Sequence, residues 1–135
     1  MNALDTNVVV RLVVEDDPGQ LAVVRELVGA AEAAGETCLL TDVVLCEIEW
    51  VLLSAYGATR ADVLAAVQSF AGESLFDFED RARLHRALDS YQHGRGDLSD
   101  YLIGHTSAAL GARTTFTFDR GLAGDPGFTV LASRR

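Results

Sequence analysis

Short apolar runs alternate along the chain with longer stretches in which apolar residues recur every three or four positions. A run of three to five β-branched, aromatic or aliphatic residues between turn residues is typical of a buried strand. Such runs predict strands at residues 3–5, 37–40, 74–78, 114–118 and 128–132. Apolar positions at helical spacing predict helices at residues 7–15, 18–35, 43–56, 59–72, 79–94 and 97–111.

Capping residues mark the starts of several predicted helices. Thr41 and Asp42 each offer an N-cap for the third helix. Thr59, with Asp62 three positions later, matches the capping-box pattern at the fourth helix. The helix at residues 79–94 is predicted to carry its acids in the first turn, where the helix dipole favours negative charge.

The alternation of strands and helices predicts the fold class. It favours an α/β protein with one parallel sheet between layers of helices, and the length of 135 residues favours a single domain over residues 1–135. In such sheets, functional sites lie at the carboxyl ends of the strands. Asp5 ends the first predicted strand and Asp119 directly follows the strand at 114–118, so we expect these two acids to converge.

The start of the next helix offers two roles for Asp5. Asp5, Thr6 or Asn7 can each cap the helix that follows. Alternatively, Asp5 is one corner of a metal site whose other carboxylates come from distant parts of the chain. Neither interpretation is specific on these residues alone.

Further candidate acids lie on predicted helices. Glu47 and Glu49 are both surrounded by apolar residues, and they point to different faces because a helix turns by about 100° per residue. Periodicity leaves open which of them faces a site. Asp97 and Asp100 share a face at the start of the last helix, where Asp97 is also a natural N-cap.

Convergence of these acids would point to a divalent metal. Carboxylates packed together repel one another, and a cation removes that conflict. Ligation by oxygen alone suits Mg²⁺ or Mn²⁺, and such ions assist hydrolysis of phosphodiesters. Thr6, Asn7 or Thr117 could then position a carboxylate or a water molecule, and capping by Asn7 is the competing interpretation.

Composition and charge narrow the function classes. The net charge is −9, and all eleven basic side chains are arginines, which argues against broad electrostatic binding of nucleic acid. Cys38 and Cys46 form no CxxC pair and are expected to be reduced thiols. No signal peptide or membrane-spanning run is evident, so we expect a cytoplasmic protein without membrane attachment.

Four stretches together resemble the PIN-domain ribonucleases, and most closely the VapC-like toxins of bacterial toxin–antitoxin pairs. They are "LDTNVVVRL", "TDVVLCEIEWVLLSAYG", "DLSDYLIGHTSAALGA" and "TTFTFDRGL". They cover nearly the whole chain in the order found in that family. By the same resemblance, the sheet and its flanking helices are expected to have the PIN-domain arrangement.

The resemblance assigns the catalytic acids to Asp5, Glu47, Asp100 and Asp119, with Asp5 and Asp100 as metal ligands. It favours Glu47 over Glu49 because the "E-x-x-W-V-L" context is similar to that of the family. Glu47, Asp97 and Asp119 are further possible ligands. If Asp97 does not bind the metal itself, it is expected to contact the residues that do.

The same comparison concerns three further positions. Thr6 and Asn7 stand where the family has threonine or serine followed by asparagine. Gly104 departs from the family pattern, which usually has alanine there.

The resemblance implies an endoribonuclease that uses Mg²⁺, with Mn²⁺ as a substitute, on single-stranded or loop RNA. It also implies a homodimer and a cognate antitoxin whose tail covers the active site. Such a tail often inserts an arginine among the acids, which suits an acidic groove. We also consider a catalytically silent PIN-like module that binds RNA or protein, and a Mg²⁺ phosphatase, against which the missing "DxD" counts.

Arginines and aromatic residues offer possible RNA contacts. Arg95 and Arg120 flank the acid motifs and could hold phosphates, whereas arginines of the helix at 79–94 have nearby acids as alternative partners. The tryptophan and the three tyrosines could stack on bases. Because core packing is the more common role of such aromatic residues, no RNA-binding residue is assigned from sequence.

Overall fold

Three short parallel strands form the sheet of the first part of the chain. They are β1 (Asn2–Ala3), β2 (Cys38–Leu40) and β3 (Phe76–Phe78), in the spatial order β1-β2-β3. The computed structural model describes residues 1–134, which form two compact units, residues 1–81 and a second unit that starts at Ala82. Each unit has its own parallel sheet.

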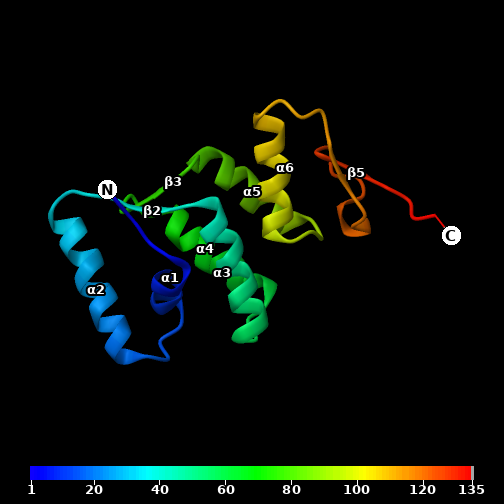
Figure 1. The fold of residues 1–135 in the computed structure, drawn as a ribbon. Coiled ribbons are helices and arrows are strands. Elements are labelled where there is room, and N and C mark those ends of the chain that lie inside the picture. The colour runs from blue at the N-terminus through cyan, green and yellow to red at the C-terminus, as the bar shows by residue number, and fades with distance from the viewer. Residues whose placement is uncertain (135) are drawn as a thin grey trace. The chain divides into compact units, whose positions relative to one another are not determined.

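Four helices accompany the first sheet: α1 (Thr6–Val13), α2 (Pro18–Ala33), α3 (Asp42–Ala55) and α4 (Arg60–Ala71). α1 packs beside α2 and α3, and α3 packs beside α4 (Figure 1). The core of this unit is mainly aliphatic, and its fully buried side chains include Val9, Leu40, Leu45, Ile48, Val63 and Val67. Most of the side chains that pack in the core with the three strands therefore come from helices.

The predicted helix boundaries of the first unit are largely confirmed. Thr41 caps α3, its hydroxyl accepting a hydrogen bond from the Val44 amide at 3.3 Å. Thr59 and Asp62 form the predicted capping box of α4. Gly57, just after α3, has a φ of +61°, a left-handed conformation that glycine adopts without a steric penalty.

The second unit contains α5 (Arg81–His93), α6 (Leu98–Ala109), β4 (Thr115–Thr117), the short 3-10 helix η1 (Arg120–Leu122) and β5 (Phe128–Val130). α5 begins at the last residue of the first unit. β4 and β5 pair in parallel, with Thr115 opposite Phe128. The Thr114 and Thr129 hydroxyls join the same two chain segments by a hydrogen bond of 2.8 Å.

The predicted α/β class with parallel strands is confirmed, whereas the single domain stays a prediction. The strands pair as two sheets, so the expected shared edge does not by itself bring Asp5 and Asp119 together: Asp5 follows β1, and Asp119 follows β4. The first strand is also shorter than predicted. It ends at Ala3, because Asp5 serves as the N-cap of α1.

The acids predicted for the first turn of the fifth helix lie just before it, and that prediction is wrong. α5 begins at Arg81, after Glu79 and Asp80. The Glu79 carboxylate instead accepts a hydrogen bond of 2.6 Å from the Asp42 amide, at the start of α3. A tertiary partner has therefore taken up an acid that local helix chemistry would place in α5.

Two smaller expectations can be compared with the structure. Cys38 is buried and Cys46 is half-buried, and the two cysteines form no disulfide with each other. Within residues 1–134, no helix combines the length and the apolar character that a bilayer-spanning segment needs.

Candidate active site

Thr6 joins two of the predicted acids in the first unit. Its backbone amide donates a hydrogen bond of 2.8 Å to Asp5 Oδ1, and its hydroxyl donates one of 3.0 Å to Glu47 Oε2. Asp5 is exposed and caps α1, while Thr6 is only 5% exposed. The capping role and the site role of Asp5 are therefore compatible, since one residue links its carboxylate to that of Glu47.

The two glutamates of α3 occupy different environments. Glu47 is exposed and reaches Thr6, whereas Glu49 is buried with 4% of its surface exposed. The two positions differ by about 200° around the helix axis, and this separates their directions. The contact with Thr6 supports Glu47, the residue that the sequence resemblance favoured.

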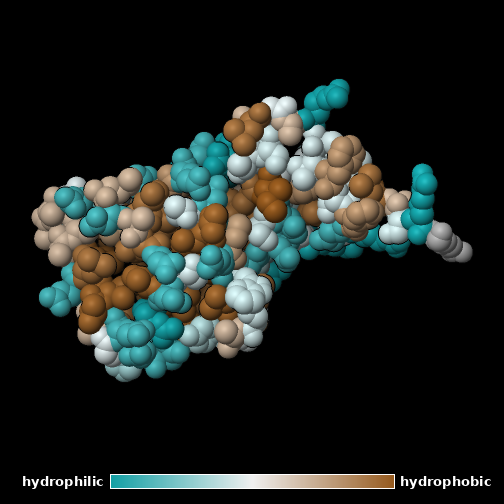
Figure 2. All heavy atoms as spheres, in the orientation of Figure 1, coloured by the Kyte–Doolittle hydropathy of each residue, from teal (hydrophilic) through white to brown (hydrophobic). Residues whose placement is uncertain are grey.

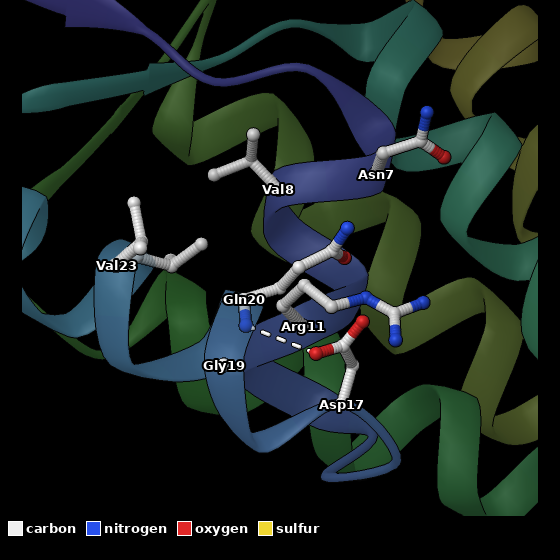
Figure 3. A pocket seen from close by; sticks show the side chains of 8 residues that line it. Asn7, Val8, Arg11, Asp17, Gly19, Gln20 and Val23 are labelled. Carbon is white, nitrogen blue, oxygen red and sulfur yellow. Dashed lines mark hydrogen bonds between the residues drawn. The ribbon is translucent and has the colours of Figure 1, made fainter.

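Asn7 is not the cap of α1, and its predicted role in positioning a carboxylate or a water molecule stays a prediction. It lies inside α1, so the cap is Asp5, and within residues 1–134 its amide makes no hydrogen bond to protein. Asn7 instead lines a pocket of about 600 Å³ between α1 and α2. Figure 3 shows Asn7 and Asp17 at opposite ends of the group of side chains around this pocket.

The surface around this pocket is apolar. Hydrophobic side chains gather on the visible face over α1 and α2 (Figure 2). On α2, Val23 is 67% and Leu27 45% exposed. Leu21 and Val24, on the same helix, are buried. The helix thus packs into the core through Leu21 and Val24 and leaves Val23 and Leu27 as apolar side chains on its exposed side.

Asp97 and Asp100 lie together at the start of α6. Asp97 occupies the N-cap position, and its backbone amide donates a hydrogen bond of 2.9 Å to Asp100 Oδ2. The N-cap position predicted for Asp97 is confirmed. Asp100, in the first turn, contributes a carboxylate to the same capping box.

Asp119 lies at the start of η1, held by two local hydrogen bonds. Its amide donates to Thr117 Oγ1 at 3.0 Å, and its Oδ1 accepts from the Gly121 amide at 2.8 Å. Thr117 thus holds the backbone of Asp119, while its predicted role in positioning a carboxylate or a water molecule stays a prediction.

The acids of the second unit act on one another electrostatically. The pKa of Asp100 is raised above its ordinary value, mainly because burial disfavours the charged form. The Asp97 amide lowers that pKa through its hydrogen bond, while the charges of Asp97 and Asp119 raise it. The negative charge of Asp100 is therefore disfavoured in the folded chain, first by burial and then by its acidic neighbours.

Two glycines hold the loop of Asp97 against η1. A Cβ atom on Gly96 would lie 2.4 Å from Leu122 Cδ2, and one on Gly121 would lie 3.0 Å from Asp119 Oδ1 and 3.5 Å from the Arg95 carbonyl oxygen. Larger residues would push these segments apart. Sequence reasoning missed these roles, although the spacing G-R-G-D marked the loop as glycine-rich.

Tyr101 anchors the same loop by a hydrogen bond. Its hydroxyl accepts a buried hydrogen bond of 2.9 Å from the Gly96 amide, and its side chain is 3% exposed. Tyr91 is also buried, so core packing rather than base stacking describes both tyrosines. Trp50, with 69% exposure, and Tyr56, with 37%, are the aromatic residues of that set that reach the surface.

Arg81 has a structural role. Its guanidinium donates hydrogen bonds to the carbonyl oxygens of Ala71 and Phe76 and lies 4.8 Å above the ring of Phe78. These contacts join α4, β3 and the start of α5. Arg81 is therefore committed to holding the fold rather than to binding a phosphate.

The described residues thus gather the predicted acids in two sets. Asp5 and Glu47 are joined in the first unit, and Asp97, Asp100 and Asp119 interact in the second. Within residues 1–134, no group of three or more histidine, cysteine, aspartate or glutamate side chains has the spacing of a metal site. Convergence of all four catalytic acids stays a prediction.

Comparison with known proteins identifies the family. The model of the PIN domain matches residues 3–124, which include all of the predicted acids. A comparison with curated proteins finds no significant match. Because the family model covers most of the sequence, the chain belongs to the PIN domain family.

Proposed function

We propose that this protein is a Mg²⁺-dependent endoribonuclease, with Mn²⁺ as a substitute ion, and that it acts as the toxin of a toxin–antitoxin pair. Membership of the PIN domain family supports a nuclease-like function. The observation that carries the proposal is how the acids are held and charged. Thr6 links Asp5 to Glu47, and Asp100 has a raised pKa beside the charges of Asp97 and Asp119.

The donor chemistry fits a hard divalent cation. Asp5 and Asp100 are proposed as ligands, with Glu47, Asp97 and Asp119 as additional candidates, and carboxylate oxygens are the donors that Mg²⁺ and Mn²⁺ prefer. When bound, such an ion activates water and stabilises the charge that develops on a phosphodiester. Thr6 and Thr117 orient Glu47 and the backbone of Asp119, so the chain itself fixes where the carboxylates point.

The proposed partners follow from charge and surface. An acidic chain with a net charge of −9 suits an antitoxin that places an arginine among the acids. A homodimer is supported by an exposed apolar stripe on α3, where Val43 is 66%, Trp50 69% and Leu53 37% exposed. We propose a cytoplasmic location for this system, where its RNA substrate is present.

Cleavage of RNA tests the enzymatic proposal. The full chain is incubated with structured RNA in Mg²⁺, in Mn²⁺ and in chelator. We expect Asp5→Asn and Asp100→Asn to lose nearly all cleavage, because each removes a proposed ligand. Glu26→Gln is the charge-matched control, since Glu26 is an exposed acid of α2. Undiminished cleavage in chelator would refute the metal mechanism.

Growth of cells tests the toxin proposal separately. Expression of the unsubstituted chain is expected to arrest growth, and co-expression of the protein encoded beside it is expected to restore growth. The Asp100→Asn variant should be harmless alone. RNA binding without cleavage in any preparation would favour a catalytically silent PIN-like module instead.

A further inference from the structure

A pocket with two arginines lies in the second unit, next to the acids. It has a volume of about 550 Å³, and its walls include His93, Arg95, Arg120 and Asp125. We call it the arginine pocket. We infer that it binds the phosphate backbone of a single RNA strand and thereby positions that strand for the proposed nuclease. The inference rests on the proposed function and adds a substrate-binding site to it.

The arginine pocket is next to Asp119. Gly121 lines the pocket, and its amide donates the hydrogen bond to Asp119 Oδ1. Arg120 directly follows Asp119, and Arg95 lies two residues before Asp97. A strand held by these arginines would therefore have a phosphate beside the carboxylates of the second unit.

Both guanidinium groups are available for a ligand. Within residues 1–134, Arg95 and Arg120 make no ion pair and no side-chain hydrogen bond, and both side chains are exposed. Arg11 and Arg25, by contrast, pair with Asp16 and Glu15. Unpaired arginines can bind phosphate with two parallel hydrogen bonds, a geometry that the guanidinium group favours.

Among the described residues, two arginines and one acid line the pocket. Asp125 is the acid in its lining, and its Oδ1 accepts a hydrogen bond of 2.8 Å from the Gly127 amide. His93 lies 3.4 Å from the Asp89 carboxylate through Nδ1. The pocket is thus a local excess of positive charge on a chain whose net charge is −9, which restricts RNA binding to a small area.

Close packing holds together the two backbone segments that carry Arg95 and Arg120. Gly96 contacts Leu122 closely, and Gly121 lies against the Arg95 backbone, so the two segments cannot separate without losing this packing. The volume is within the range of pockets that bind small organic ligands, about 300–1,000 Å³. It has room for a nucleotide unit rather than a lone phosphate.

Binding of RNA in chelator tests the arginine pocket without cleavage. The probe is a short fluorescent oligouridylate, and its anisotropy is followed with the full chain at several salt concentrations. Arg95→Gln and Arg120→Gln are each expected to weaken binding about threefold and to reduce the salt slope by about 0.7. Arg113→Gln is the matched control, because Arg113 is an exposed arginine of the same unit outside the pocket.

The outcomes separate this inference from the nuclease proposal. Equal losses for all three variants, or no RNA binding by the unsubstituted chain at low salt, would overturn the arginine pocket as an RNA site even if RNA is cleaved in Mg²⁺. Pocket-dependent binding without cleavage would support the inference and refute the nuclease. Binding of an oligoglutamate peptide in place of RNA would overturn the inference in favour of a protein-docking site.

Discussion

The Thr6 hydroxyl donates a hydrogen bond of 3.0 Å to Glu47 Oε2, across 41 positions of sequence. The same residue donates its amide to Asp5 Oδ1. A single buried threonine therefore fixes the relative positions of two carboxylates from α1 and α3. Because the contact uses a hydroxyl, a residue of the same shape without that group isolates its contribution.

Replacing Thr6 by valine tests this contact. Thr6→Val keeps the shape of the side chain and the hydrogen bond from the residue 6 amide to Asp5 Oδ1. It removes the hydroxyl that donates to Glu47. We expect RNA cleavage to need a higher Mg²⁺ concentration, by about 10-fold, because partners that orient ligands commonly contribute that much. Titration of cleavage with Mg²⁺ measures it, with Thr129→Val as the control hydroxyl deletion. An unchanged Mg²⁺ midpoint would exclude a positioning role for Thr6.

Replacing Asp100 by asparagine tests the repulsion among the acids of the second unit. At neutral pH and without metal, we expect Asp100→Asn to raise the melting temperature by a few degrees, because burial and the nearby charges of Asp97 and Asp119 disfavour a charged Asp100. The asparagine oxygen can still accept from the Asp97 amide. Thermal unfolding measures the change, and a lower melting temperature would show that capping outweighs repulsion.

The gain in stability expected from Asp100→Asn should depend on pH. The pKa of Asp100 is raised in the folded chain, so the native state binds a proton that the unfolded state has already released. Stability from this group is present below the ordinary pKa of 3.8 and is lost as the pH rises through the raised value. The difference between variant and unsubstituted chain should therefore shrink on acidification; a constant difference would contradict this assignment.

Tyr101→Phe tests the anchor of the loop before Asp97. The change leaves the buried Gly96 amide without its acceptor, which costs about 1–3 kcal/mol of unfolding free energy. We also expect weaker RNA cleavage, because the loop carries Asp97. Urea unfolding measures the cost, and Tyr56→Phe, at an exposed tyrosine, is the control. Equal effects of the two variants would rule out a special role for the Gly96 contact.

Gly104→Ala tests the departure from the family pattern. A Cβ atom at Gly104 would lie 2.7 Å from Cε2 of Phe128, too close for a normal contact, so the ring must move. We expect a loss of about 1 kcal/mol, since overpacking outweighs the better helix propensity of alanine. Gly29→Ala is the matched control, because its Cβ atom meets nothing within 4 Å, and it should stabilise α2. Stabilisation by both variants would disprove the contact.

Local sequence patterns predicted the elements because the physics of caps and periodicity is local. Thr59 with Asp62 and Thr41 formed caps where the pattern placed them. Where a distant group competed, the prediction was wrong. Glu79 accepts a hydrogen bond from the Asp42 amide and lies before the first turn of α5.

The candidate acids of the site were predicted from the resemblance in sequence, whereas their contacts and burial are known only from the structure. Glu47 was favoured over Glu49 by sequence context, and its contact with Thr6 supports that choice, which helix periodicity alone left open. The roles of Gly96 and Tyr101 were missed, because a close approach between segments leaves no local signal beyond a glycine.

The sequence by itself determined the α/β class, the caps of α3 and α4 and the identity of the candidate acids, since each depends on residue type and short spacing. Only the tertiary structure decided which side chains touch: Thr6 with Glu47, Gly96 with Tyr101, and Arg81 with the carbonyl oxygens before α5. The physical reason is that burial, pKa and hydrogen-bond partners depend on neighbours brought together by folding.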